Sequence, residues 1–107
     1  MIVRQALFEG RIHDGREAAF RAYVADRLLP LWRRFPEVRE VRVLHGIEHD
    51  PGVPEVALAL SMAFDDAGAL ARALESAVRY ESREVTRGLL AMFDGSVRHH
   101  VFELHPR

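Results

Sequence analysis

The chain lacks cysteine, and all 15 of its basic residues are arginine rather than lysine. Because there is no cysteine, disulfides cannot indicate a redox compartment, and no CxxC motif is present. The missing lysine has two interpretations: a coding bias of the source organism, or the recognition of phosphate or carboxylate groups by arginine. The arginines are scattered along the chain, which favours the coding bias.

The chain also lacks a charge field of one sign and a long apolar run. Its formal net charge is −1, so we expect no surface that would hold nucleic acid or an anionic membrane. No stretch approaches the length of a membrane span, and the N-terminus shows no basic region followed by a long apolar run. The sequence therefore predicts a cytoplasmic protein with no nucleic-acid or membrane partner.

What is present is typical of a single globular domain over residues 1–107, with a hydrophobic fraction of 49% and a charged fraction of 29%. Some segments have the β-branched, aromatic or alternating pattern of strands, and they lie at residues 2–12, 38–47, 56–64 and 96–104. The sequence EHDPGVPE, between the second and third of these segments, has the residues of a turn.

Helical spacing follows the first predicted strand. Asp14 and Glu17 have the form of a capping box, and an apolar stripe with three- and four-residue spacing continues from there to Leu31. Pro30 removes a backbone donor inside this pattern. The helix is therefore expected to kink at Pro30 or to end by Leu29.

A second helical stretch follows the third predicted strand. It opens with Asp65 or Asp66 as its cap, and its apolar stripe extends over residues 67–93. A single helix of that length would span about 40 Å, whereas the strand at residues 56–64 spans only about 30 Å. We therefore expect a break near residues 80–82, with Asp94-Gly95 ending the second piece.

The order of these elements is strand, helix, strand, strand, helix, strand, without repeats or linkers. If both crossovers are right-handed, both helices pack on the same face of the sheet. The predicted fold class is therefore α+β, a ferredoxin-like βαββαβ domain with a four-stranded antiparallel sheet.

The strand VALALSMAF, residues 56–64, has no charge on either face. Its bulky residues alternate with the small residues Ala57, Ala59, Ser61 and Ala63. Two helices cover one face of the predicted sheet, and no residues remain to cover the other. A second copy of the chain, packed sheet to sheet about a two-fold axis, is the economical cover. We therefore expect a homodimer.

Two stretches resemble EthD-like proteins of the dimeric α/β-barrel superfamily. PLWRRFPEV, residues 30–38, resembles their Pro-Leu-x-x-x-x-Pro segment, and FDDAGALARALES followed by DGSVRHHVFEL resembles the second half of the superfamily. Relatives often carry a histidine two residues before the first proline, where this chain has Leu28. Any role of that histidine is therefore not carried over.

The resemblance implies a homodimer whose two sheets form a shared barrel, with a small-molecule pocket in each subunit between helices and sheet. Members of the superfamily include cofactor-free oxygenases, lactone isomerases, polyketide cyclases and many proteins of unknown activity. The resemblance therefore does not fix the reaction. No cofactor is expected.

Histidines are the candidates for catalysis, because no nucleophile elbow, phosphate loop or HExxH motif is present. His45 continues the face of Val41 and Val43, and a half-buried imidazole can carry a proton near neutral pH. His99 and His100 are adjacent in a strand, so they point to opposite faces and only one can face a pocket. His45 and His99 are the catalytic candidates, and a packed or rim histidine is the alternative for each.

Aromatic and amide side chains are the candidates for substrate binding. Tyr23, Tyr80 and Trp32 are suited to line a pocket for a flat organic ligand, and ordinary packing is the alternative for each. Arg4 and Gln5 lie on the first strand, which is central in the predicted sheet, and polar groups there need partners. A ligand contact and a hydrogen bond across the dimer interface are equally good explanations.

No metal site is expected. His45 and His49 have the spacing of a helical metal-binding pair, but on an extended chain they lie about 13 Å apart, which is too far to share one ion.

Two functions compete. The first is an enzyme that performs cofactor-free proton transfer on a small aromatic or carbonyl metabolite, as an isomerase, a cyclase or a cofactor-independent monooxygenase. The second is a non-catalytic dimeric protein that binds a small molecule in the same pocket. RNA binding, which the RRM performs with the same order of elements, is disfavoured because VALALSMAF has no pattern of exposed aromatic and basic residues.

Overall fold

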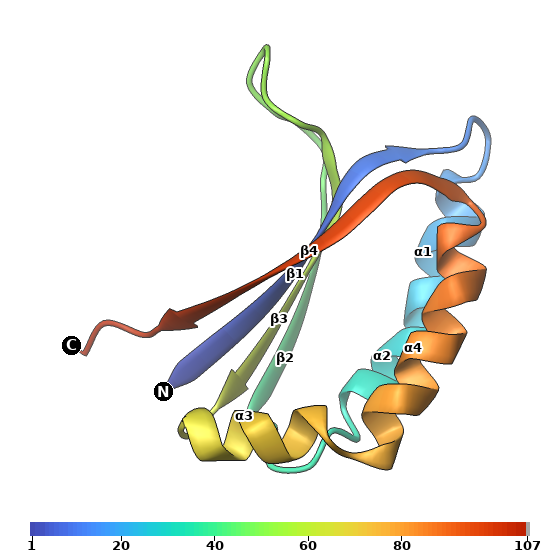
Figure 1. Ribbon diagram of the computed structural model, residues 1–107. Coiled ribbons are helices and arrows are strands. Elements are labelled where there is room, and N and C mark those ends of the chain that lie inside the picture. Colours follow the sequence, from blue (N-terminus) through green and yellow to red (C-terminus); the bar gives the residue numbers. More distant parts are fainter. Residues whose placement is uncertain (107) are drawn as a thin grey trace.

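The computed structural model describes residues 1–106 and shows a four-stranded sheet with helices on one side (Figure 1). The strands are β1 (Ile2–Ile12), β2 (Glu40–His45), β3 (Val56–Phe64) and β4 (Phe93–Glu103). All neighbours pair antiparallel, in the order β2-β3-β1-β4. The predicted ferredoxin-like βαββαβ fold is confirmed.

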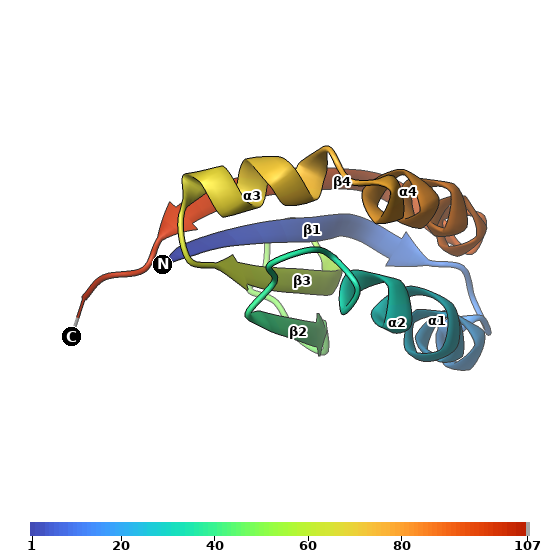
Figure 2. The same cartoon turned by 90° about the horizontal axis from the view of Figure 1, so that it is seen from below.

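The helical segments lie in two stretches. After β1, the segments α1 (Glu17–Tyr23), η1 (Val24–Leu28) and α2 (Leu29–Trp32) follow one another directly, and η1 is a π-helical turn. After β3 come α3 (Ala67–Leu74) and α4 (Ala77–Leu90). The helix α4 runs beside the first stretch, whereas α3 lies across the end of the sheet (Figures 1 and 2).

The core lies between the sheet and these helices. Phe8 of β1 is paired with Leu58 of β3, and both are buried beneath the helices. Phe20, Leu28 and Leu89 supply the helical side of the core and are fully buried. Because side chains alternate along each strand, the bulky residues of VALALSMAF all enter this layer, as its pattern predicts.

The opposite face of the sheet is open. No helix of residues 1–106 covers it (Figure 1). At its centre Gln5 pairs with Ser61, and the small residues of β3 lie around them. Leu44 and Phe102, toward the two edges of this face, are 54% and 49% exposed. The open face is therefore uncharged along β3, and its edges carry Leu44 and Phe102 beside the ion pairs Arg42–Glu40 and Arg98–Glu9.

The first helix starts later than the capping box predicts. Its N-cap is Arg16, with no side-chain cap, and Asp14 lies in the turn that precedes it. Gly15 has φ of 76°, outside the right-handed helical region, so the helix cannot run through it. The prediction of Asp14 as a cap is therefore wrong, because the left-handed glycine separates Asp14 from the first helical turn.

Pro30 changes the helix without ending it. The N–H of Leu29 donates to the carbonyl of Val24, five residues back, and the chain passes through η1 before α2 begins. Pro30 then lies in the first turn of α2, where a missing N–H leaves no broken helical bond. The predicted kink takes the form of a π-helical turn.

The break in the second stretch exists, but its predicted position at residues 80–82 is wrong. The helix α3 ends at Leu74, and Ser76 adopts an extended conformation before α4 begins. The hydroxyl of Ser76 donates to the carbonyl of Ala73 at 2.6 Å and so satisfies an acceptor at the end of α3. Asp66 caps α3 as expected, because its carboxylate accepts the N–H of Ala69 at 2.8 Å.

Asp94 and Gly95 do not end a helix. The helix α4 stops at Leu90, and β4 already begins at Phe93. Gly95 pairs with Gly10 of β1, and a Cβ on Gly10 would lie 2.1 Å from the carbonyl oxygen of Asp94. Pairing between β1 and β4 therefore uses the two glycines for a close approach of the strands, and it overrides the turn tendency of Asp-Gly.

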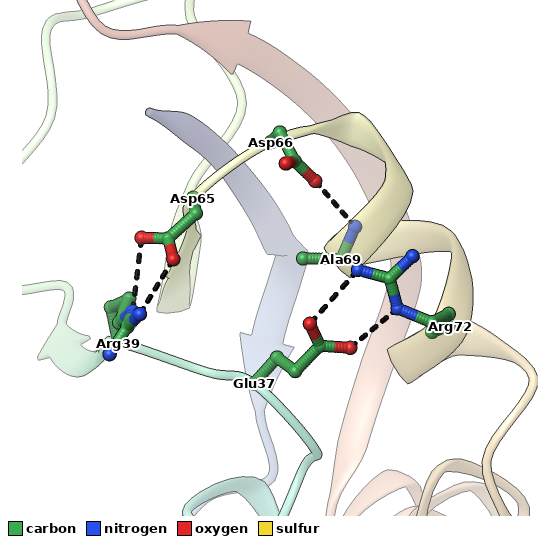
Figure 3. A network of polar contacts seen from close by, with 6 residues as sticks. All are labelled: Glu37, Arg39, Asp65, Asp66, Ala69 and Arg72. Carbon is green, nitrogen blue, oxygen red and sulfur yellow. Dashed lines mark hydrogen bonds and ion pairs between the residues drawn. The ribbon is translucent and has the colours of Figure 1, made fainter.

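Exposed ion pairs connect α3 to the segment before β2 (Figure 3). Arg72 donates to both carboxylate oxygens of Glu37 at 2.6 and 2.9 Å, and Arg39 donates to both oxygens of Asp65 at 3.0 and 2.6 Å. These hydrogen bonds lower the pKa of Glu37 and of Asp65. The two bidentate pairs fix the position of α3 at the end of the sheet.

Candidate functional site

A cavity of about 660 Å³ lies between the sheet and the helices, and it is partly open to solvent. Its apolar floor comes from the sheet, and one wall comes from a face of α4. The sheet residues that line it are Arg4, Ala6, Phe8, Leu60, Met62, Val97 and His99. The residues of α4 that line it include Arg79, Tyr80, Arg83, Glu84, Thr86 and Arg87.

His99 is the histidine of β4 that faces this cavity. The pairing of β4 with β1 places His99 opposite Ala6 and His100 opposite Gln5. Since successive side chains of a strand point to opposite faces, His99 lies on the helix side and lines the cavity. His100 lies on the open face, where its ring stacks with Phe102 at a centroid distance of 6.0 Å.

The surroundings of His99 favour a neutral imidazole. Burial lowers the pKa of His99 below its ordinary value of 6.5, and the positive charges of Arg4 and Arg79 lower it further, as does His100. The imidazole is therefore uncharged at pH 7 and able to accept a proton.

Arg4 is the unusual residue of the cavity. It lies half-buried on the central strand β1, where it is paired with Met62 and Val101. Burial lowers the pKa of Arg4 below its ordinary value, and the charge of Arg79 lowers it further. The sequence singled out Arg4 as a polar group that needs a partner. It did not single out Arg79, because the helix break was predicted at residues 80–82 and not before the start of α4.

Two of the predicted substrate-binding residues line the cavity. Trp32, the last residue of α2, is buried in its wall. Tyr80 is 54% exposed in the first turn of α4, and the guanidinium of Arg79 lies 6.0 Å from the centroid of its ring. The structure therefore brings Tyr80, Trp32 and His99 around one space.

Tyr23 lies outside this set. Its hydroxyl donates to the carbonyl of Val85 at 2.7 Å, and its ring packs against α4 at Gly88. The guanidinium of Arg27 lies 5.5 Å from the ring centroid. Tyr23 therefore joins the two helical stretches, and it is not among the residues that line the cavity.

Gln5 lies on the open face, opposite Ser61 on one side and His100 on the other. It is separated from the cavity by the thickness of the sheet. Of the two explanations that the sequence left open for Gln5, a contact across a subunit interface fits this position, and a contact with a ligand in the cavity does not.

His45 lies on the helix side of β2, opposite Leu58, but it does not line the cavity. The strands of His45 and His99 are at opposite edges of the sheet, so the two rings lie at least about 14 Å apart across it. Burial lowers the pKa of His45, and the charge of Arg21 lowers it further. His45 and His99 therefore cannot act on the same proton.

The described part of the chain offers no metal cluster. No group of three or more histidine, cysteine, aspartate or glutamate side chains is close enough to hold an ion within residues 1–106. Among the helices of these residues, none combines the length and the apolar character needed to cross a bilayer.

No protein-family model matches the chain, and no curated protein matches it in sequence. Solved structures, in contrast, match over nearly its whole length. An EthD family protein from Bacillus halodurans superposes with a TM-score of 0.75 at 19% identity, covering 98% of this chain and 99% of that chain.

Two further structures have the same architecture. SnoaB, a cofactor-independent oxygenase from Streptomyces nogalater, gives a TM-score of 0.66 at 19% identity, with 99% of this chain and 94% of that chain covered. A dimeric protein of unknown function and ferredoxin-like fold from Bacteroides fragilis gives a TM-score of 0.66 at 16% identity, with 96% and 95% covered.

These comparisons define the class of fold. The chain has the ferredoxin-like fold of EthD-type proteins and of antibiotic biosynthesis monooxygenases. The resemblance carried by PLWRRFPEV and by the second half of the chain is therefore confirmed at the level of the fold. Because such folds carry many reactions, the activity has to be argued from the cavity itself.

Proposed function

We propose that the chain is a small-molecule enzyme of the dimeric α/β-barrel type, which performs cofactor-free proton transfer on a small aromatic or carbonyl compound. The observation that carries the proposal is the position of His99, a neutral imidazole on the wall of a cavity that also presents Tyr80 and Trp32. A cytoplasmic location stays a prediction.

In the proposed reaction, His99 removes a proton from the bound compound and returns it at another position. An isomerisation or a cyclisation needs no further reactant, whereas an oxygenase would also take up molecular oxygen as its cosubstrate. Tyr80 supplies a phenol that can hold a carbonyl or hydroxyl group of the compound, and Trp32 supplies a flat apolar wall. SnoaB is a cofactor-independent oxygenase with this fold, which supports the same class of chemistry.

The proposal includes a homodimer formed through the open face of the sheet. This face presents Leu44 and Phe102 to solvent in the single chain, with uncharged residues of β1 and β3 between them. Burying such a face against its own copy removes apolar surface from water without leaving an unpaired charge at the centre. One structure of the same fold is described as a dimeric protein, which supports this arrangement.

Deuterium exchange tests the proposed chemistry without knowledge of the natural substrate. A panel of aromatic ketones and other carbonyl compounds is incubated with the protein in D₂O, and deuterium at the carbon beside the carbonyl is followed by proton NMR. We expect enzyme-dependent exchange for at least one compound, and a loss of at least about 100-fold in His99→Ala, because general-base catalysis contributes a factor of that order.

The matched variants are His45→Ala, the other catalytic candidate, and His49→Ala, whose ring lies in the exposed β2–β3 loop. His49→Ala should retain the full exchange rate. If His45→Ala and His99→Ala both retain it, the two catalytic assignments fail. Binding of ligands without any exchange or turnover would favour a non-catalytic binding protein.

A further inference from the structure

The cavity contains more positive charge than the chain itself neutralises. Its lining includes the four arginines Arg4, Arg79, Arg83 and Arg87, and a single acidic residue, Glu84. Glu84 is paired with Arg87 at 3.5 Å. Within residues 1–106, Arg4, Arg79 and Arg83 make no ion pair with a carboxylate.

Two arginines outside the cavity have the carboxylate partners that the cavity arginines Arg4 and Arg79 lack within the described residues. Arg39 and Arg72 are exposed, and each donates two hydrogen bonds to one carboxylate (Figure 3). Arg4 is half-buried, where a charge is more costly, and it has no side-chain hydrogen bond within the described residues. Among residues 1–106, Arg79 donates only to the carbonyl of Leu74 at 3.2 Å, which leaves most of its donors available there.

Arg4 and Arg79 are also close enough to repel each other. The charge of Arg79 lowers the pKa of Arg4, and both charges lower the pKa of His99. Three basic groups from β1, α4 and β4 therefore converge on one space, and the one acidic residue of its described lining, Glu84, is paired with Arg87 instead. An anion at this point would relieve the repulsion and accept charge-assisted hydrogen bonds from both guanidinium groups.

The rest of the cavity lining is apolar, so an organic anion fits the cavity better than a small inorganic anion does. Beside the arginines it presents Phe8, Leu60 and Met62 from the sheet and Trp32 from α2. A volume of about 660 Å³ is in the range of sites for small organic ligands. The matching ligand has a charged end and a flat apolar body.

We propose that the cavity binds an organic carboxylate, whose carboxylate group is held between Arg4 and Arg79 while its apolar body lies over Phe8 and Leu60. This inference rests on the proposed function for the identity of the cavity as the ligand site, and it specifies the class of ligand. Arg4 would then be a specificity-determining residue, because its guanidinium forms a charge-assisted hydrogen bond with a carboxylate but not with a neutral analogue.

Binding of matched probes tests the inference independently of turnover. Isothermal titration calorimetry compares 2-naphthoate, the neutral 2-naphthamide and 2-naphthyl phosphate on the full chain. We expect the carboxylate to bind at least about tenfold more tightly than the amide, since hydrogen bonds to a charged group are worth about 1.5–3 kcal/mol. Arg4→Gln and Arg79→Gln should each remove most of that preference, while binding of the amide changes little.

Arg16→Gln is the matched control, because Arg16 is exposed at the start of α1 and does not line the cavity. It should leave the preference for the carboxylate intact. Far-UV circular dichroism and thermal unfolding of each variant verify that it is folded. A second readout is the pKa of His99 by NMR, which should rise when the carboxylate binds to the wild-type protein, because an anion offsets the two positive charges.

Equal binding of the carboxylate and the amide would overturn the inference and leave the cavity as a neutral ligand site, with the proposed function intact. Tighter binding of the phosphate than of the carboxylate would overturn the choice of carboxylate. Absence of binding by all three probes would overturn the inference as well. Loss of exchange activity in His99→Ala, in contrast, tests only the proposed proton transfer.

Discussion

His45 has a ring nitrogen, Nδ1, that is buried in the folded chain. Within the described residues, this Nδ1 makes no hydrogen bond, and the ring of His45 lies on the helix side of β2. Burial is the larger cause of its lowered pKa, and the charge of Arg21 is the smaller one. The folded protein therefore binds a proton at His45 less readily than the unfolded chain does, since the unfolded pKa is about 6.5.

This difference predicts a loss of stability in acid. Between the lowered pKa of folded His45 and the unfolded value of about 6.5, the unfolded state binds more protons, so the free energy of unfolding rises with pH across that window. We expect His45→Leu to lose less stability than the wild type between pH 7.5 and pH 5. Urea unfolding of both proteins at the two pH values measures this difference in the free energy of unfolding.

The matched variant is His49→Leu, in the exposed loop, which should follow the wild-type pH dependence. Asp65 and Glu37 have lowered pKa values as well, but carboxylates of this kind lose their stabilising effect below about pH 4, outside the window. Identical slopes for His45→Leu and the wild type would exclude His45 as the source.

The site could be predicted from the sequence only in part, and the reason is visible at single residues. Strand alternation places His99 and His100 on opposite faces, but it does not say which face the helices cover. That choice depends on the pairing of β4 with β1, a contact between distant parts of the chain. Arg79 and Tyr80 enter the cavity only because the chain turns at Ser76, and no local pattern marked that position.

At the scale of elements, the contact between α1 and α4 depends on a glycine. A Cβ on Gly88 would lie 2.1 Å from the hydroxyl oxygen of Tyr23 and 2.6 Å from its Cζ. Tyr23 is held in place by its hydrogen bond to the carbonyl of Val85. The ring therefore occupies the space that any other residue at position 88 would need.

Gly88→Ala should lower the free energy of unfolding by about 1–3 kcal/mol, the usual cost of overpacking, despite a gain of about 1 kcal/mol in helix propensity. Gly68→Ala in α3 is the matched control, since its Cβ would come no closer than 3.3 Å to the guanidinium of Arg72 and to a carboxylate oxygen of Asp66, against 2.1 Å at Gly88. It should be neutral or stabilising. Equal effects of the two substitutions in chemical denaturation would contradict the proposed contact.

The elements themselves were easier to predict than their ends. The spans of β1 and β3 follow directly from their β-branched, aromatic and alternating residues. The start of α1 and the start of β4 were missed for the same physical reason. In each case a backbone requirement, the left-handed Gly15 or the close approach of Gly10 and Gly95, outweighs the local signal of a neighbouring aspartate.

At the scale of the whole molecule, the fold was predictable because the order of elements, with right-handed crossovers, places both helical stretches on one side of the four-stranded sheet. The open face then predicts the assembly. Ala59→Arg places a charge near the centre of that face, beside the Leu7 and Leu44 positions with which Ala59 is paired. We expect the variant to be monomeric, with a mass near 12.2 kDa, where the wild type has about twice that mass by light scattering.

Ala22→Arg is the matched control, because Ala22 is exposed on α1 and away from the open face. It should assemble as the wild type does. A wild-type protein that is monomeric at micromolar concentration would refute the dimer, and so would an Ala59→Arg variant that is folded and still dimeric.

Adjacent residues of the paired strands β1 and β4 have different tasks: Arg4 and His99 face the cavity, while their neighbours Gln5 and His100 face away from it. Deleting or inserting one residue within β1 or β4 would move every later side chain of that strand to the opposite face of the sheet. Natural versions of this protein should therefore differ in length in the connections between elements, such as the loop at residues 46–55, and not within β1 or β4.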